Sequence, residues 1–130
     1  MDRKEYRVAV ASTDGIVVNQ HFGKAGTFYI YQVQRQGSGN GDEDSTEICI
    51  RLLAKREVIP VCQGGNHDDN RMRKNIQQLA GCDYLLAQQA GIGACRMLQE
   101  QGIEVYQFPG MIEESIRQMD IQIQIQELFD

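Results

Sequence analysis

The chain has 130 residues, of which 42% are hydrophobic and 24% charged, and its formal net charge is -5. This length is typical of one folded domain, and the composition is that of an ordinary globular protein. No apolar run approaches the roughly 20 residues that cross a bilayer, and no apolar leader follows the first residues, so we expect a cytoplasmic protein with no membrane partner. Lysines and arginines scattered through an acidic chain also argue against a nucleic-acid partner.

The first half of the chain has the residue pattern of three strands. Residues 6–12 and 27–33 alternate in polarity and are rich in β-branched and aromatic side chains, and residues 46–58 form the third expected strand. The segment 36–45 contains turn-forming residues and no apolar one. We therefore expect a loop there that joins the second and third strands as an antiparallel hairpin.

From residue 68 onward, helices are expected to alternate with buried strands. Met72 and Ile76 begin an apolar stripe with helical spacing, residues 68–70 can cap its start, and Gly81 fits its end. After this helix we expect, in chain order, a strand, a short helix, a strand and a last helix, at residues 82–88, 91–102 and 103–108 and from Met111 onward.

The order of these elements predicts an α/β fold. An antiparallel hairpin region followed by two strand–helix units gives a mixed five-stranded sheet, in which the second strand is antiparallel, with helices on its faces. This is a ribonuclease-H-like, three-layer α/β/α arrangement. The tail 120–129 fits two structures, because its isoleucines alternate as in a strand while its glutamines favour a helix that continues the preceding stripe. We favour the helix.

The four cysteines are Cys49, Cys62, Cys82 and Cys95, and no two of them form a C-x-x-C pair. This spacing argues against a zinc ribbon or a thioredoxin-type motif. In a cytoplasmic protein we expect free thiols that serve mainly as small core residues. At least two of Cys49, Cys82 and Cys95 should then be buried.

Three segments contain residues that could carry chemistry. His21 lies in the turn-like segment 17–26, where a turn alone needs no imidazole. The "GIG" at 91–93 is either a tight strand-to-helix turn or a turn whose backbone N–H groups bind an anion. Cys62 and His67 lie in the glycine-rich stretch 62–70, which is otherwise a loop with a helix cap. A nuclease is disfavoured, because the strand ends do not supply the several carboxylates that hold two metal ions.

The segments "DGIVVNQHFGKAGTFYIYQV" and "CQGG…RMRKNIQQLAGCDYLLAQQAGIGACRMLQEQGIEVY" resemble the dinitrogenase iron–molybdenum cofactor-binding family. That family includes the NifX and NafY carriers and the C-terminal domain of NifB. The resemblance runs from about residue 7 to about residue 116, which we take as the core of a single domain at 1–130 with a C-terminal extension at 117–130. It implies a ribonuclease-H-like fold without nuclease activity.

The resemblance also implies a site and a ligand. Members bind iron–sulfur or iron–molybdenum cofactor precursors, so His21 is the expected iron ligand and Lys24 adds positive charge for an anionic cluster. The His21 ring should be accessible to solvent. The other expected cofactor-binding residues are Asn19, Phe22, Gly23, Cys62, Gly64, Gly65, Gly91 and Gly93.

The expected function follows from this ligand. The sequence contains no radical-SAM cysteine motif and no second domain, so we expect a carrier that holds and delivers a cluster and is not an enzyme. Its expected partner is a cofactor-assembly protein or a target metalloprotein, and it is expected to be a monomer or a homodimer. The alternative is a regulatory or scaffolding module that binds a partner protein. Which cluster it binds is left open.

Overall fold

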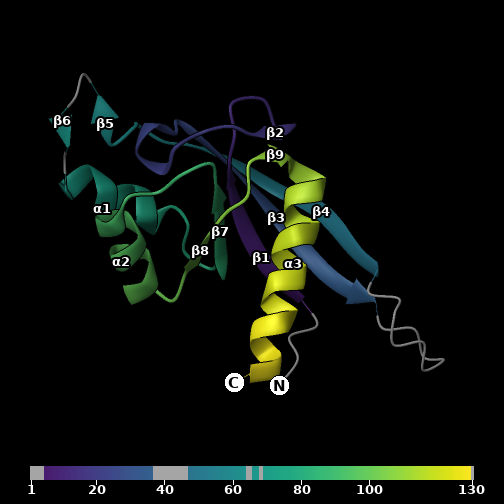
Figure 1. Ribbon diagram of the computed structural model, residues 1–130. Helices are drawn as coiled ribbons and strands as arrows, with labels where there is room; N and C mark the ends of the chain where they lie inside the picture. Colours follow the sequence, from purple (N-terminus) through teal and green to yellow (C-terminus); the bar gives the residue numbers. More distant parts are fainter. Residues whose placement is uncertain (1–4, 37–46, 64–65, 68, 130) are drawn as a thin grey trace.

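The computed structural model describes residues 5–36, 47–63, 66–67 and 69–129 (Figure 1). Its central sheet has the strand order β4-β3-β1-β7-β8. These strands are β1 (Glu5–Ala11), β3 (Thr27–Gln36), β4 (Glu47–Glu57), β7 (Tyr84–Ala87) and β8 (Glu104–Gln107). β3 runs antiparallel to β1 and β4, whereas β1, β7 and β8 are mutually parallel. The predicted mixed five-stranded sheet with an antiparallel second strand is confirmed.

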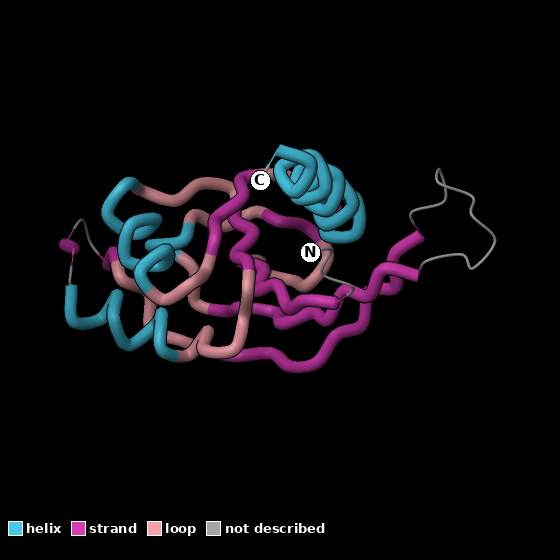
Figure 2. The backbone as a smooth tube through the Cα atoms, turned by 90° about the horizontal axis from the view of Figure 1, so that it is seen from below, coloured by secondary structure: helices cyan, strands magenta, loops and turns pink. Residues whose placement is uncertain are grey.

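Three helices cover the two faces of this sheet. α1 (Asp69–Gln77) and α2 (Ile92–Glu100) lie over one face, and α3 (Ile112–Phe129) lies over the other (Figures 1 and 2). None of the described helices is long and apolar enough to cross a bilayer. The α/β class and its layers agree with the sequence prediction, while the term ribonuclease-H-like stays a prediction, as does the single domain at 1–130.

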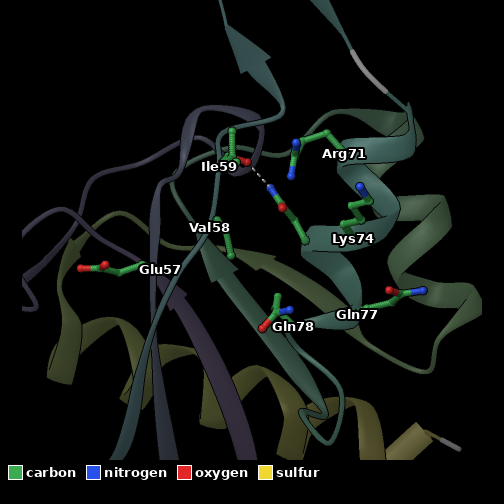
Figure 3. A pocket seen from close by; sticks show the side chains of 8 residues that line it. Glu57, Val58, Ile59, Arg71, Lys74, Gln77 and Gln78 are labelled. Carbon is green, nitrogen blue, oxygen red and sulfur yellow. Dashed lines mark hydrogen bonds between the residues drawn. The ribbon is translucent and has the colours of Figure 1, made fainter.

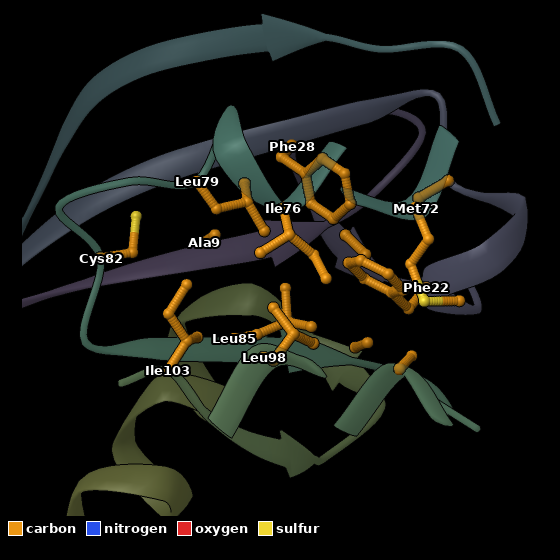
Figure 4. Packing of buried hydrophobic residues seen from close by; sticks show 14 of the residues in the cluster. Ala9, Phe22, Phe28, Met72, Ile76, Leu79, Cys82, Leu85, Leu98 and Ile103 are labelled. Carbon is orange, nitrogen blue, oxygen red and sulfur yellow. The ribbon is translucent and has the colours of Figure 1, made fainter. Parts of the chain in front are cut away.

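Alternation along the strands builds a core on each side of the sheet. Successive side chains of a strand point to opposite faces. In β1, Ala9 and Ala11 pack under α1 and α2, whereas Val8 and Val10 pack under α3. Figure 4 shows the cluster under α1 and α2, in which the Phe22 and Phe28 rings lie 5.7 Å apart.

The structure also contains short elements that the sequence analysis did not predict. β2 (Val17–Val18) pairs with β9 (Gly110–Met111), and β5 (Cys62–Gln63) pairs with β6 (Asn66–His67). A single 3-10 turn, η1 (Phe22–Lys24), follows β2. Strands of two residues have too few side chains to show a period of two, which is why pattern reading missed them. The loop expected at 36–45 lies almost wholly outside the described residues.

The ambiguous tail is helical, because α3 continues to Phe129. Ile116, Met119 and Ile123 are buried, whereas Ile121 and Ile125 are 54% and 42% exposed. The isoleucines at 121, 123 and 125 alternate in sequence, but only the one at 123 continues the buried stripe. The helical spacing of the apolar residues before this segment therefore predicted its structure, and the alternation of its isoleucines did not.

α3 is also fixed to the sheet by a buried polar group. The Asp120 side chain, 4% exposed, accepts hydrogen bonds from Tyr6 Oη at 2.7 Å and from Arg35 Nε at 3.0 Å. Gln124 Nε2 donates to its second oxygen at 2.7 Å. Burial, together with the hydrogen bond to Asp120, raises the pKa of Tyr6, so this phenol keeps its proton and donates. The network connects β1, β3 and α3.

We expect Asp120→Ala to destabilise the protein by about 3 kcal/mol, because it leaves the Arg35 cation and the Tyr6 hydroxyl without their buried acceptor. Urea unfolding followed by circular dichroism measures this change. Glu127→Ala is the matched control, since Glu127 also pairs with Arg35 but its side chain is 22% exposed; its cost should be ~1 kcal/mol or less. Equal losses for the two variants would contradict the role given to Asp120.

Candidate functional site

His21 lies where the turn after β2 crosses the end of β7. It forms an isolated parallel bridge with Gln89. The Phe22 backbone N–H donates to the Gln89 carbonyl at 2.8 Å, and the Gln88 N–H donates to the Gln20 carbonyl at 3.0 Å. The next side chain, Phe22, is 1% exposed and packs in the core, while His21 itself is partly exposed. The backbone at His21 is therefore held in place without burying its ring.

A cavity of about 370 Å³ lies beside this turn. Nine residues from three separate parts of the chain line it, namely His21, Phe22, Gly23, Lys24, Met72, Gln89, Gly91, Gly93 and Ala94. Six of these were expected from the sequence. The structure thus brings the His21 turn and the "GIG" turn, about 70 positions apart in sequence, to one place.

The cavity is at the carboxyl end of β7, where the chain turns into α2. In α/β sheets, ligands bind outside the carboxyl ends of the parallel strands. Gly91 caps α2 without a side-chain hydrogen bond, and the helical ladder begins with the Cys95 N–H donating to the Gly91 carbonyl at 3.0 Å. The N–H groups of a helix's first turn have no acceptor within the helix and favour an anion. The residues of this turn border the cavity.

The two glycines of the turn keep this wall open. A Cβ added at Gly91 or Gly93 would meet nothing within 4 Å, and neither residue has a positive φ. Backbone geometry and packing therefore do not require glycine at either position. A side chain there would instead occupy space beside the cavity, so the glycines allow a ligand to approach the backbone closely.

The remaining walls combine apolar and cationic groups. Met72 is 3% exposed and supplies an apolar thioether from α1, next to Phe22 (Figure 4). Lys24 is exposed at the rim. Among the residues that the structure describes, no three His, Cys, Asp or Glu side chains gather to hold a metal ion.

Among the other expected site residues, Asn19 is described with its side chain and does not line the cavity. The Asn19 side chain accepts a hydrogen bond from the Thr13 N–H at 3.0 Å and donates to Thr13 Oγ1 at 2.8 Å, so it braces the loop that leads to His21. β5, which begins at Cys62, lies beside η1. Gly64 and Gly65 fall outside the described residues.

Three lining residues were not expected from the sequence. Met72 was assigned to the core by its helical spacing, and it serves both the core and the cavity. Gln89 and Ala94 have no distinctive residue type. Their position gives the only available signal, because Gln89 follows the carboxyl end of the buried strand β7 and Ala94 lies in the first turn of the next helix, where ligand sites of α/β proteins form.

The prediction that at least two of Cys49, Cys82 and Cys95 are buried is wrong. Only Cys82 is buried, whereas Cys95 is partly exposed and Cys49 is exposed. Cys49 lies on β4, an edge strand whose outward-facing positions reach solvent. Burial raises the pKa of the Cys82 thiol to about 11. Burial also raises the pKa of Cys95.

Comparison with known families identifies the family of this chain. A model of the family described as dinitrogenase iron–molybdenum cofactor matches residues 4–120. The chain belongs to this family. The family resemblance inferred from the His21 turn and the "GIG" segment is thereby confirmed, and the matched range contains every residue that lines the cavity.

Curated relatives of this family member include FeMo cofactor biosynthesis proteins and Protein NifX. The chain is 32% identical over 115 residues to the FeMo cofactor biosynthesis protein NifB of Frankia alni, covering 86% of this chain and 20% of that protein. It is 32% identical over 98 residues to Protein NifX of Azotobacter vinelandii, covering 75% of this chain and 53% of that protein. The chain therefore spans about a fifth of the NifB relative and about half of NifX.

Solved structures share the fold of this family member. The NMR structure of a Thermotoga protein provisionally assigned as NifB matches with a TM-score of 0.50 and 24% identity, covering 88% of this chain and 87% of that one. The crystal structure of a Methanocaldococcus jannaschii protein provisionally assigned as a dinitrogenase matches with a TM-score of 0.50 and 13% identity, covering 86% and 85%. At these identities the likeness shows the fold alone.

The thiols should differ sharply in reactivity. With a pKa of about 11, only about one Cys82 thiol in a thousand is ionised at pH 8, and the thiolate is the reactive form. We expect iodoacetamide to modify Cys82 at least about 100-fold more slowly than the exposed Cys49, as measured by peptide mass spectrometry at pH 8. The Cys82 rate should rise as the pH approaches 11. Similar rates at pH 8 would contradict the burial of Cys82.

Proposed function

We propose that this chain is a carrier that holds an iron–sulfur or iron–molybdenum-type cofactor, or a precursor of it, and delivers it without catalysing a reaction. One observation carries the proposal: His21 and the open glycine turn at 91–93 converge on one cavity in a member of the iron–molybdenum cofactor family. The similarity to NifB and NifX supports a role for this chain in cofactor biosynthesis or in a step close to it.

In this proposal the residues around the cavity have separate roles. The His21 imidazole binds an iron atom of the cargo, since a neutral ring nitrogen is a common ligand of iron. The N–H groups at the start of α2 and the Lys24 ammonium interact with the negative charge of the cluster. Phe22 and Met72 keep water from the inner wall, which strengthens these electrostatic interactions.

Asn19 and Cys62 have less direct roles in this proposal. Asn19 fixes the loop 13–19 and thereby the backbone that leads to His21. Cys62 is a candidate second ligand, because β5 lies beside η1 and a cysteine thiolate is a preferred ligand of iron–sulfur clusters. A single strong protein ligand with auxiliary contacts suits a carrier, because the cargo must leave again.

His21→Ala should weaken binding of an iron–sulfur cofactor at least tenfold, or about 1.4 kcal/mol, through loss of one metal–ligand bond. Anaerobic titration with the cofactor extracted from a cofactor-assembly protein, followed by its absorption spectrum and iron analysis, measures the affinity. The fold should be unchanged, because the ring is partly exposed. Gln20→Ala is the matched control, since Gln20 is adjacent in sequence but does not line the cavity.

Wild-type affinity in His21→Ala would remove His21 from the site. If the wild-type chain itself takes up no cofactor under these conditions, the carrier proposal fails and the alternative, a module that binds a partner protein, is favoured instead.

Gly93→Ala separates stability from binding. Gly93 lies in α2 and a Cβ there meets nothing within 4 Å, so alanine should stabilise the fold by up to about 1 kcal/mol through its higher helix propensity. The same methyl group borders the cavity and should lower cofactor affinity several-fold. Thermal unfolding and the anaerobic titration measure the two effects. A variant that is more stable and binds as tightly as wild type would show that the cargo does not approach this turn.

A further inference from the structure

A second hollow, of about 480 Å³, lies on the other side of α1 (Figure 3). It is a cleft with α1 on one side and, on the other, the end of β4 and the residues that follow β4. Its lining residues are Glu57, Val58, Ile59, Arg71, Lys74, Asn75, Gln77 and Gln78. None of them lines the cavity at His21, so the two hollows are separate.

One wall of this cleft is a row of hydrogen-bond donors. Arg71, Lys74 and Asn75 lie on one face of α1, and Gln78 continues their spacing directly after its last residue. Arginine and lysine side chains are donors only, and the glutamine amide can donate as well. In Figure 3 the Arg71 side chain extends from α1 toward the segment that holds Ile59. A ligand that complements this wall has to carry acceptors.

The opposite wall, formed by the end of β4 and the residues after it, is held to α1 by hydrogen bonds. Asn75 is 3% exposed, and its Nδ2 donates to the Ile59 carbonyl at 2.7 Å, which ties α1 to the chain after β4. Arg56 Nη1 donates to the Gln78 carbonyl at 2.9 Å. This second bond places a further cation, from β4, at the carboxyl end of α1. The cleft is thus braced at both ends by side chains that are already hydrogen-bonded.

The part of the sequence that supplies this cleft is richer in cations than the rest of the acidic chain. Residues 47–78 contain 6 of the 13 Lys and Arg residues but only 4 of the 18 Asp and Glu residues. This part of the chain is therefore net positive, while the remainder is net negative. Among the described residues that line the cleft, Glu57 is the one acid, and its side chain, 78% exposed, pairs with Lys55.

We propose that the cleft between α1 and the end of β4 binds an acidic segment of a partner protein. Along α1, the row from Arg71 to Gln78 spans about 10 Å. That length matches about three residues of an extended chain at roughly 3.3 Å each, so its carboxylates can meet Arg71, Lys74 and Gln78 while Asn75 stays bonded to Ile59. A single small anion uses only part of the row, and a nucleic acid or an anionic membrane requires a broader basic face than this acidic molecule offers.

The cleft is adjacent to the proposed cofactor cavity through α1. Met72 on this helix lines the cavity, whereas its neighbour Arg71 lines the cleft. An α-helix is about 10 Å across, so a protein segment in the cleft lies about one helix diameter from the cargo. Interpreting the cleft as the place where an acceptor or donor of the cofactor binds rests on the proposed function; the binding of an acidic segment does not.

The test uses N-acetyl hexaglutamate amide as the probe, titrated into the ¹⁵N-labelled full chain at low salt. We expect amide chemical-shift changes at residues 57–59 and 71–78, and weaker binding as salt is raised, because exposed charges are screened. The double variant Arg71→Glu/Lys74→Glu should lose at least tenfold in affinity. Arg73→Glu/Arg96→Glu carries the same change in net charge on exposed residues outside the cleft and should lose less than threefold.

Equal losses in the two double variants, or shift changes elsewhere on the protein, overturn the proposal. So does binding of inorganic phosphate, a short oligonucleotide or phosphatidylserine vesicles at these residues with equal or higher affinity. If the glutamate variant does not fold, Arg71→Gln/Lys74→Gln replaces it, with the same expected direction and Arg73→Gln/Arg96→Gln as its control.

The two proposals fail separately. His21→Ala should keep peptide affinity while losing cofactor, and Arg71→Glu/Lys74→Glu should keep cofactor uptake while losing the peptide. Loss of cofactor uptake by wild type alone removes the carrier function and leaves the acidic-segment site standing. If the wild type takes up cofactor but binds no peptide, the acidic-segment site is removed and the carrier function stands.

Discussion

The candidate site depends on one backbone contact, the crossing of the His21 turn over the end of β7. Two hydrogen bonds, Phe22 N–H to the Gln89 carbonyl and Gln88 N–H to the Gln20 carbonyl, join segments that are far apart in sequence. The buried Phe22 ring prevents the turn from lifting away, because exposing an aromatic ring to water is costly. His21, Gly91 and Met72 meet at one cavity only because this crossing is formed.

The sheet makes the crossing possible. β7 pairs in parallel with β1, so the carboxyl ends of both strands emerge at the same edge of the sheet. The chain that leaves β1 returns through β2 and η1, and the chain that leaves β7 enters α2 at the same edge. The small side chains of Ala9, Ala11 and Ala87 allow α1 and α2 to pack closely beneath this edge. The antiparallel β3–β4 pair widens the sheet on the other side.

Much of this architecture could be predicted from the sequence, because long elements carry a period. The alternation in β1 and β3 and the apolar stripes of α1 and α3 identified those elements, and their order along the chain predicted the mixed sheet. Cys49 and Cys95 were misjudged, because a cysteine's residue type does not say whether its strand is at an edge or whether its helical position faces solvent. The two-residue strands were missed for lack of any period.

The site was predictable only in part, for a different physical reason. His21 and the glycine turn stand out because a turn needs no imidazole and a helix start rarely needs two glycines. Gln89 and Ala94 have ordinary side chains, and only their place after the end of β7 brings them to the cavity. Asn19 was assigned to the site by the family resemblance, and its amide instead hydrogen-bonds with Thr13 within its own loop.

The position of α1 between the cavity and the cleft has a thermodynamic consequence. Met72 packs beside Phe22 at the cavity, while Asn75 on the same helix holds the chain at Ile59. The two proposed sites thus share one short helix of nine residues. Any linkage between their ligands through this helix is reciprocal: whatever free energy a bound acidic segment adds to or subtracts from cargo binding, the cargo returns to the segment in equal amount.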